Sequence, residues 1–237
     1  MLTRPHLSDR AEYLIEQCRG KRVLHVGCGD DPFTEAKLSN GSLLHSLLSE
    51  VASRCCGVDS SVSSIELLKR HGFNDVLSGS IETLVRSGAI RSGDFDVVLA
   101  AEVLEHVSDA GRFLCSLQSL LKRPADRLIV TTPNAYCAYR WAYTMLTGRE
   151  SGHPDHVAHY SRNTLTLLLK RCGLEVESVR YYSGKEYIHN RGRQRLFWWI
   201  DRIAYRLRPE LGDGLIVSCK SIGATATTAK EAIGPAA

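Results

Sequence analysis

Apolar runs alternate with amphipathic segments along most of the chain, and this alternation predicts the fold class. Runs rich in Val, Ile, Leu and Cys predict buried strands over 22–29, 55–59, 75–80, 95–100 and 126–134. Apolar residues at helical spacing predict helices over 8–19, 42–54, 61–72, 110–123 and 161–173. Strands that alternate with helices in this way predict an α/β protein whose parallel sheet is covered on both faces.

The last third of the chain follows a different pattern. Residues 135–160 are rich in aromatic residues and histidines and have no clear period, so we expect a loop region there. The segments after it predict a strand, a basic amphipathic helix and a final strand, over 174–182, 191–208 and 213–221. The sequence shows no repeat and no linker, so we expect one domain over 1–221 that begins with an N-terminal helix in 1–20. A disordered tail is expected over 222–237.

Composition narrows the class of protein only slightly. The 237 residues are enough for one large α/β domain, and a net charge of +4 permits an anionic ligand without requiring nucleic acid. The eight cysteines form no C-x-x-C pair, and several fall in predicted strands or helices, so we expect reduced, mostly buried thiols. The first ten residues contain no apolar core of a signal peptide, and no apolar run has the length of a membrane span. These features together predict a cytoplasmic protein.

A glycine turn followed by an acidic residue is the first chemical signature. In "VLHVGCGD", Gly27 and Gly29 end a buried strand, and Asp59 stands at the tip of the next one. Such a turn lets the backbone approach a ligand closely, and the acid can accept both hydroxyls of a ribose. Asp30 and Asp31 stand where a pyrophosphate-binding loop would have its third glycine. Because their carboxylates would repel a pyrophosphate, they favour a positively charged nucleoside such as S-adenosylmethionine. The alternative is that the glycines only form a tight turn.

At this point the sequence resembles the class I S-adenosylmethionine-dependent methyltransferases. The segments that carry the resemblance are "VLHVGCGD", "GVDSS", "DFDVVLAAEVLEHV" and "LIVTTPN", which lie within 20–135, and "HPDHVAHYSRNTLTLLLKRCGLEVESV" extends it to about residue 180. The resemblance implies a Rossmann-like, seven-stranded sheet of order 3-2-1-4-5-7-6 with the last strand antiparallel. It also places the cofactor at the carboxyl ends of the first two strands.

The resemblance further implies which residues touch the cofactor. Carried over position by position, they are Gly27, Cys28, Gly29, Asp59, Ser60, Ser80, Ile81, Ala101 and Glu102. Ser80 departs from the pattern, because many relatives have there an aspartate that accepts the adenine amino group. Either the Ser80 hydroxyl or the Ile81 backbone is then expected to make that contact.

The segment "EVLEH" is the second signature. If it is helical, Glu102, Glu105 and His106 lie on one face directly after a buried strand. With "TPN" and a later "DH" segment, it is similar to two subgroups: the ubiquinone-biosynthesis O-methyltransferases and the small-RNA 2′-O-methyltransferases. The second subgroup implies a divalent metal, whose ligands here would be Glu102, Glu105, His106 and His156.

Several roles of these histidines remain open at this stage. A mixed oxygen and nitrogen ligand set suits Mn²⁺, Co²⁺, Fe²⁺ or Zn²⁺ better than Mg²⁺. Without a metal, His106 or His156 would bind the acceptor or act in catalysis. His153 and His159 flank His156 at three-residue spacing, and either is a candidate general base. A purely structural role is the remaining alternative.

We therefore expect an enzyme that O-methylates a small-molecule hydroxyl, such as that of a saccharide or natural product. The alternatives are a 2′-O-methyltransferase acting on RNA, which the modest charge disfavours, and a non-catalytic binding module. Region 135–160 is expected on the acceptor side. The basic helix 191–208 either packs on the sheet edge or contacts a membrane surface, which would suit a lipid-linked acceptor. The sequence leaves the oligomeric state open.

Overall fold

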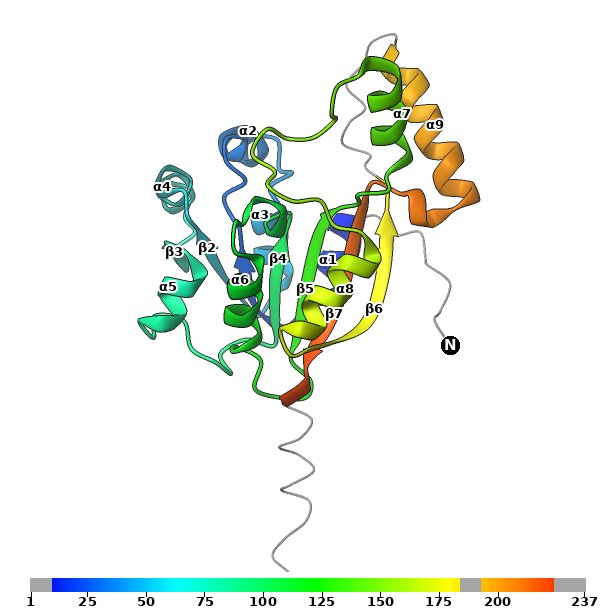
Figure 1. The fold of residues 1–237 in the computed structure, drawn as a ribbon. Helices are drawn as coiled ribbons and strands as arrows, with labels where there is room; N and C mark the ends of the chain where they lie inside the picture. The colour runs from blue at the N-terminus through cyan, green and yellow to red at the C-terminus, as the bar shows by residue number, and fades with distance from the viewer. Residues whose placement is uncertain (1–9, 184–192, 224–237) are drawn as a thin grey trace, which may run out of the picture.

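Seven strands form one sheet in the order β3-β2-β1-β4-β5-β7-β6, as the resemblance implies. The computed structural model describes residues 10–183 and 193–223 (Figure 1). The strands are β1 (Arg22–Val26), β2 (Arg54–Asp59), β3 (Val76–Ser78), β4 (Val97–Ala101), β5 (Arg127–Pro133), β6 (Leu174–Tyr182) and β7 (Gly214–Ser221). Strands β1 to β5 pair in parallel, and β7 runs antiparallel to both of its neighbours. The carboxyl ends of the parallel strands therefore share one edge of the sheet.

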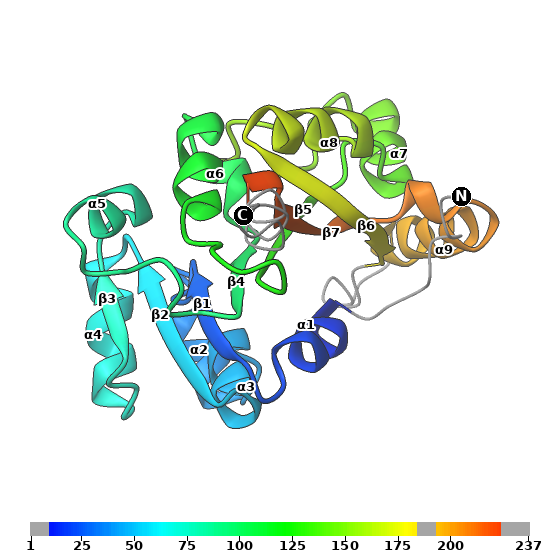
Figure 2. The ribbon, with the colours of Figure 1, turned by 90° about the horizontal axis from the view of Figure 1, so that it is seen from below.

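Helices cover both faces of this sheet (Figure 2). Their bounds are α1 (Arg10–Cys18), α2 (Thr34–Ser39), α3 (Leu44–Val51), α4 (Val62–Arg70), α5 (Ile81–Arg86), α6 (Ala110–Gln118), α7 (Ala138–Thr147), α8 (Arg162–Arg171) and α9 (Arg193–Leu207). Two short 3₁₀ turns, η1 (Leu104–His106) and η2 (Pro209–Leu211), complete the elements.

The core is split by the sheet because successive side chains of a strand point to opposite faces. On one face, Val98 of β4 packs with α6 and α8, which contribute residues such as Leu117 and Leu169. On the other face, Leu99 packs with α1 and α3. A sheet that is buried on both sides explains why its strands appear as continuous apolar runs in the sequence.

The structure differs from the predicted elements mainly between strands. Two six-residue helices, α2 and α5, were not expected, and α7 occupies part of the region 135–160 that was expected to be a loop. In α7, no residue is fully buried, although Ala138, Trp141, Ala142 and Met145 have the i, i+3, i+4, i+7 spacing of a helix. The start of the predicted helix 8–19, the first two residues of the predicted helix 191–208 and most of the predicted tail lie outside the described residues.

Helices α7 and α9 pack on each other beyond the carboxyl edge of the sheet (Figure 1). The segment that carries α7 leaves the sheet after β5 and returns beside it. At its base, Ala135 N donates to the Tyr160 carbonyl at 2.8 Å, and a bridge joins Asn134 to Tyr160. Because its two ends are joined in this way, the segment 135–160 places its histidines next to the carboxyl ends of β4 and β5.

None of the helices within residues 10–183 and 193–223 is both long enough and apolar enough to span a membrane.

Candidate active site

The turn after β1 requires glycine at two positions. Gly27 has a φ of +80°, and a Cβ atom there would lie 2.2 Å from Cγ2 of Val103. A Cβ atom on Gly29 would lie 2.6 Å from Ser64 Cβ and 2.9 Å from Asp59 Oδ2. The backbone of this turn thus packs closely against Val103, Ser64 and Asp59. Without side chains at these two positions, the backbone can also come close to a bound ligand.

Asp59 ends β2 and fastens the turn to the next strand. Its Oδ2 accepts a hydrogen bond from Gly29 N at 2.7 Å, and its Oδ1 accepts one from Ser61 N at 2.9 Å. Each carboxylate oxygen keeps a further lone pair that can accept a hydroxyl. The side chain is therefore held in place before any ligand binds, at the sheet edge where a ribose is expected.

The other predicted cofactor residues lie along the same edge with different exposure. Cys28 and Ala101 are buried, and Ser60 is exposed. Ser80 caps α5, because its hydroxyl accepts a hydrogen bond from Thr83 N at 3.3 Å. Its side chain is exposed near the carboxyl edge of the sheet. Ile81 is 2% exposed, so only its backbone is available to a ligand.

The turn after β4 is not the helix that the spacing of Glu102, Glu105 and His106 suggested. Glu102 has a φ of +55°, a left-handed conformation that is uncommon for a side chain of this size, and only 104–106 form a 3₁₀ turn. Glu102 N donates to the Thr131 carbonyl at 3.0 Å, which helps to fix this conformation. The two glutamates consequently point into different surroundings.

Glu102 lies in a network that joins four elements. Its Oε1 accepts from Thr131 Oγ1 at 2.7 Å and from Tyr182 Oη at 2.9 Å. Arg10 Nη1 of α1 lies 3.6 Å from the same oxygen, and the guanidinium stands over the Tyr182 ring at 5.7 Å. Burial, and next the charge of Glu102, raises the pKa of Tyr182 well above its usual range. The network ties the first helix to the cofactor edge.

Glu105 is buried, with 1% of its surface exposed. Its Oε2 accepts from Thr132 Oγ1 at 3.0 Å, whereas Oε1 has no hydrogen-bond partner. Burial, followed by the nearby charge of Glu102, raises the pKa of Glu105 to about 8. Burial thus favours the neutral form of this carboxyl, which is less costly to bury than the charged form.

Three histidines gather beside this turn. Among the described residues, His106, His153 and His156 each offer one ring nitrogen within 4.8 Å of the others. The His106 and His156 rings lie 4.7 Å apart between centroids, and the rings of His153 and His156 lie 5.8 Å apart. His159 is adjacent, with its ring 5.9 Å from that of His156. Burial, and next the neighbouring His106, lowers the pKa of His156 to about 4.

The predicted metal ligands are brought together only in part. His106 and His156 lie in one cluster, which His153 completes. Glu102 faces Tyr182, and Glu105 faces Thr132. The two carboxylates and two imidazoles implied by the small-RNA subgroup do not converge on one point, so that particular set does not fit a metal in this structure.

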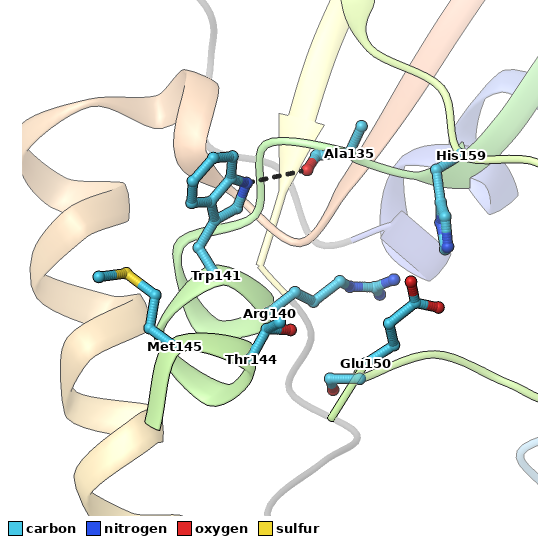
Figure 3. A pocket seen from close by; sticks show the side chains of 8 residues that line it. Ala135, Arg140, Trp141, Thr144, Met145, Glu150 and His159 are labelled. Carbon is cyan, nitrogen blue, oxygen red and sulfur yellow. Dashed lines mark hydrogen bonds between the residues drawn. The ribbon is translucent and has the colours of Figure 1, made fainter. Parts of the chain in front are cut away.

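A cavity of about 350 Å³ has His159 on its wall (Figure 3). Trp141 and Met145 of α7 give it an apolar side, and Trp141 Nε1 donates to the Ala135 carbonyl at 3.3 Å. Arg140, Glu150 and His159 point toward one another on its polar side (Figure 3). Asp213 holds the guanidinium, because Arg140 Nη2 donates to its Oδ1 at 2.9 Å. The cavity has the mixed lining that small-molecule sites usually show.

The sheet order, the glycine turn and the acid at the tip of β2 together define a class I S-adenosylmethionine-dependent methyltransferase. A family model described as "Methyltransferase domain" matches residues 4–179, and the chain belongs to this family. S-adenosylmethionine is accordingly its cofactor. The cofactor would be held by the Gly27–Gly29 turn and by Asp59, and a Cβ atom on either glycine would disturb that turn.

Among the curated relatives, ubiquinone biosynthesis O-methyltransferases are similar to this chain. The mitochondrial enzyme of Schizosaccharomyces pombe is 34% identical over 134 residues, which are 53% of this chain and 44% of the relative. The enzyme of Xanthomonas axonopodis pv. citri is 28% identical over 215 residues, covering 84% and 82% of the two chains. The match spans about half the length of the first of these relatives.

Solved structures share the fold at low identity. A SAM-dependent methyltransferase from Archaeoglobus fulgidus superposes with a TM-score of 0.58 at 19% identity, and the match covers 90% of this chain and 91% of that one. A small RNA methyltransferase superposes with a TM-score of 0.57 at 20% identity, covering 90% of this chain but 25% of that one.

Sequence reasoning missed the partners of the two glutamates. Thr131 and Thr132, adjacent residues of β5, point to opposite faces of the sheet, so one reaches Glu102 and the other reaches Glu105. The "TTP" segment contained the signal, since two hydroxyls at the end of a buried strand need polar partners. Tyr182 could not be paired with Glu102 from the sequence because the two are 80 positions apart.

Proposed function

We propose that the protein transfers a methyl group from S-adenosylmethionine to a hydroxyl oxygen of a small molecule, such as a saccharide or natural product. When bound, S-adenosylmethionine supplies a methyl group activated by its positively charged sulfur. The observation that carries the proposal is the cavity with His159 on its wall, at the same sheet edge as the glycine turn. The names of the curated relatives, which are O-methyltransferases, support oxygen as the methylated atom.

His159 is the group that we assign as general base. Its imidazole lines the cavity, and a neutral imidazole can take the hydroxyl proton as the oxygen attacks. Arg140 and Glu150 supply a donor and an acceptor for further polar groups of the acceptor molecule. Trp141 offers an aromatic face on which a sugar or ring can stack. The polar and apolar sides of the cavity would thus fix the orientation of the reacting hydroxyl.

Helix α9 supports an acceptor with an apolar tail. Trp199, Ile203 and Leu207 are spaced by four residues, and each is more than half exposed, at 54%, 55% and 73%. Residues four apart lie on one face of a helix, so they form an exposed apolar stripe next to α7. Arg202 and Arg206 are exposed between them. A lipid-linked headgroup could then enter the cavity while its tail lies along α9.

The test is an assay for S-adenosylhomocysteine with panels of phenols, saccharides and lipid-linked hydroxyl compounds, with RNA as the contrasting acceptor. We expect turnover with one of the small molecules. His159→Ala should lower kcat by about 10²–10⁴-fold without weakening cofactor binding. His71→Ala, an exposed histidine at the end of α4, is the matched control and should retain full activity. Turnover with RNA alone, or an unchanged kcat in His159→Ala, would refute the proposal.

The tail contact has its own test. Ile203→Ser should raise the KM for a tailed acceptor and leave the KM for the same headgroup without a tail unchanged. An equal change of the KM for both acceptors would mean that α9 only packs against the protein and does not contact an acceptor tail.

A further inference from the structure

The histidine cluster has a ligand set of its own. We propose that His106, His153 and His156 form a site for a transition-metal ion of the Zn²⁺ type, with neither Glu102 nor Glu105 as a ligand. His106 lies in η1, and His153 and His156 lie in the loop between α7 and α8. Each of the three offers one ring nitrogen within 4.8 Å of the others. This set differs from the carboxylate-containing set that the small-RNA subgroup implies.

The backbone holds the two elements of the cluster against each other. Val157 N donates to the Glu105 carbonyl at 2.9 Å, which fixes the loop next to the turn that carries His106. Within the loop, His156 N donates to the His153 carbonyl at 3.1 Å, so a tight turn places both imidazoles on the same side. The geometry of the site therefore rests on backbone hydrogen bonds and not on long, flexible side chains.

One ring nitrogen in the cluster lacks a protein partner. His156 Nδ1 is buried and accepts or donates no hydrogen bond. An orphaned buried nitrogen costs free energy unless a ligand satisfies it. Two nitrogens bound to one Zn²⁺ at about 2.1 Å each lie less than about 4.2 Å apart, so nitrogens that are 4.8 Å apart need to approach by at least about 0.6 Å. His106 and His153 are exposed and have room for that adjustment.

Both carboxylates would have to move to join the cluster. Moving Glu102 into the cluster would break its hydrogen bonds with Thr131 and Tyr182 and its ion pair with Arg10. Glu105 would have to move from a position that is 1% exposed, because its unpartnered Oε1 is not among the ligand atoms of the described residues that lie within 4.8 Å of one another. Neither movement is needed to complete a cluster that already has three nitrogens.

Three imidazoles select the metal by their chemistry. Nitrogen ligands suit Zn²⁺, Co²⁺, Ni²⁺ and Cu²⁺, whereas Mg²⁺ prefers oxygen ligands and near-ideal octahedral geometry. Three protein ligands also leave a coordination position open, as in catalytic zinc sites. His159 lies beside His156 and also lines the cavity, so the cluster adjoins the proposed acceptor site. A role in the reaction rests on the proposed function, but binding of the ion does not.

The experiment measures binding alone. Protein without a polyhistidine tag, freed of metal by a chelator, is titrated with Zn²⁺, Co²⁺ and Mg²⁺ by calorimetry in the absence of cofactor and acceptor. We expect one Zn²⁺ or Co²⁺ per chain and no binding of Mg²⁺. The visible spectrum of Co²⁺ gives a second readout, because nitrogen ligands change its absorption.

Three variants separate the two ligand sets. His153→Ala should weaken Co²⁺ binding by more than the roughly 10- to 100-fold that loss of a ligand's outer partner costs. Glu102→Gln and the control His71→Ala should bind Co²⁺ as the parent protein does. Absence of Zn²⁺ and Co²⁺ binding, or unchanged binding in His153→Ala, would overturn the proposal. Loss of binding in Glu102→Gln would overturn it in favour of the carboxylate set. Methyl transfer by chelator-treated protein would leave the proposed function intact, so the two failures are distinguishable.

Discussion

Replacing Gly29 with alanine tests the cofactor site at its tightest point. The added methyl group would lie 2.6 Å from Ser64 Cβ and 2.9 Å from Asp59 Oδ2. Ser64 is buried in α4 and cannot yield, so the turn or the Asp59 carboxylate must move. We therefore expect Gly29→Ala to fold with reduced stability and to bind S-adenosylmethionine weakly.

The magnitude follows from the hydrogen bond that is lost. Once Asp59 is displaced, it loses the hydrogen bond that it is expected to accept from a ribose hydroxyl of the cofactor, and a hydrogen bond to a charged group contributes about 1.5–3 kcal/mol. Because about 1.4 kcal/mol corresponds to a tenfold change in affinity, the Kd should rise roughly 10- to 100-fold. Overpacking should lower the free energy of unfolding by about 1–3 kcal/mol in addition.

Isothermal titration calorimetry with S-adenosylmethionine is the assay, and two further variants complete it. Asp59→Asn keeps the volume but removes the charge, and it should weaken binding to a similar extent without a clash. Gly111→Ala in α6, whose Cβ would approach Asp109 Oδ1 only to 3.7 Å, is the matched glycine control and should bind normally. If folded Gly29→Ala and Asp59→Asn both bound with the parent Kd, the cofactor would not lie at this turn.

The remaining predictions concern stability and the acceptor. Tyr182→Phe removes a buried hydroxyl that donates to the Glu102 carboxylate at 2.9 Å, and urea denaturation should show a free energy of unfolding lower by about 1.5–3 kcal/mol; no loss would mean that the network is not stabilising. Burial lowers the pKa of His45, whose ring lies against His25, from 6.5 to about 4. The unfolded chain therefore takes up this proton first, and the free energy of unfolding should fall by about 3 kcal/mol as the pH drops from 7 to 4. A His45→Gln variant should show a shallower fall, and an equal fall would contradict the assignment. Trp141→Ala should raise the acceptor KM roughly tenfold with little change in kcat, whereas a selective fall in kcat would remove its stacking role.

The fold was predictable because its signals are local and repeated. The central parallel strands β1, β4 and β5 are apolar runs buried on both faces, and each long helix has an apolar stripe of its own. The six-residue helices α2 and α5 are too short to show a period. Helix α7 packs against α9, which follows it by more than forty residues, and no local pattern reports such a contact.

The candidate site was only partly predictable, and the turn after β4 shows why. Spacing places Glu102 on a helix face, but a φ of +55° turns its carboxylate toward Tyr182 on β6. The partner that stabilises this conformation is supplied by the tertiary fold. His153 was recognised as a candidate base from its spacing, while its place in the histidine cluster depends on how the loop docks on η1.

The central claim is that the methyl group goes to a hydroxyl oxygen of a small molecule held beside His159. The most direct measurement uses S-adenosylmethionine labelled with ¹³C in its methyl group, and follows the label into the acceptor by nuclear magnetic resonance. We predict a product whose labelled carbon has the chemical shift of a methoxy group, formed by the parent protein and nearly absent with His159→Ala. A labelled carbon attached to nitrogen or to carbon would contradict the account.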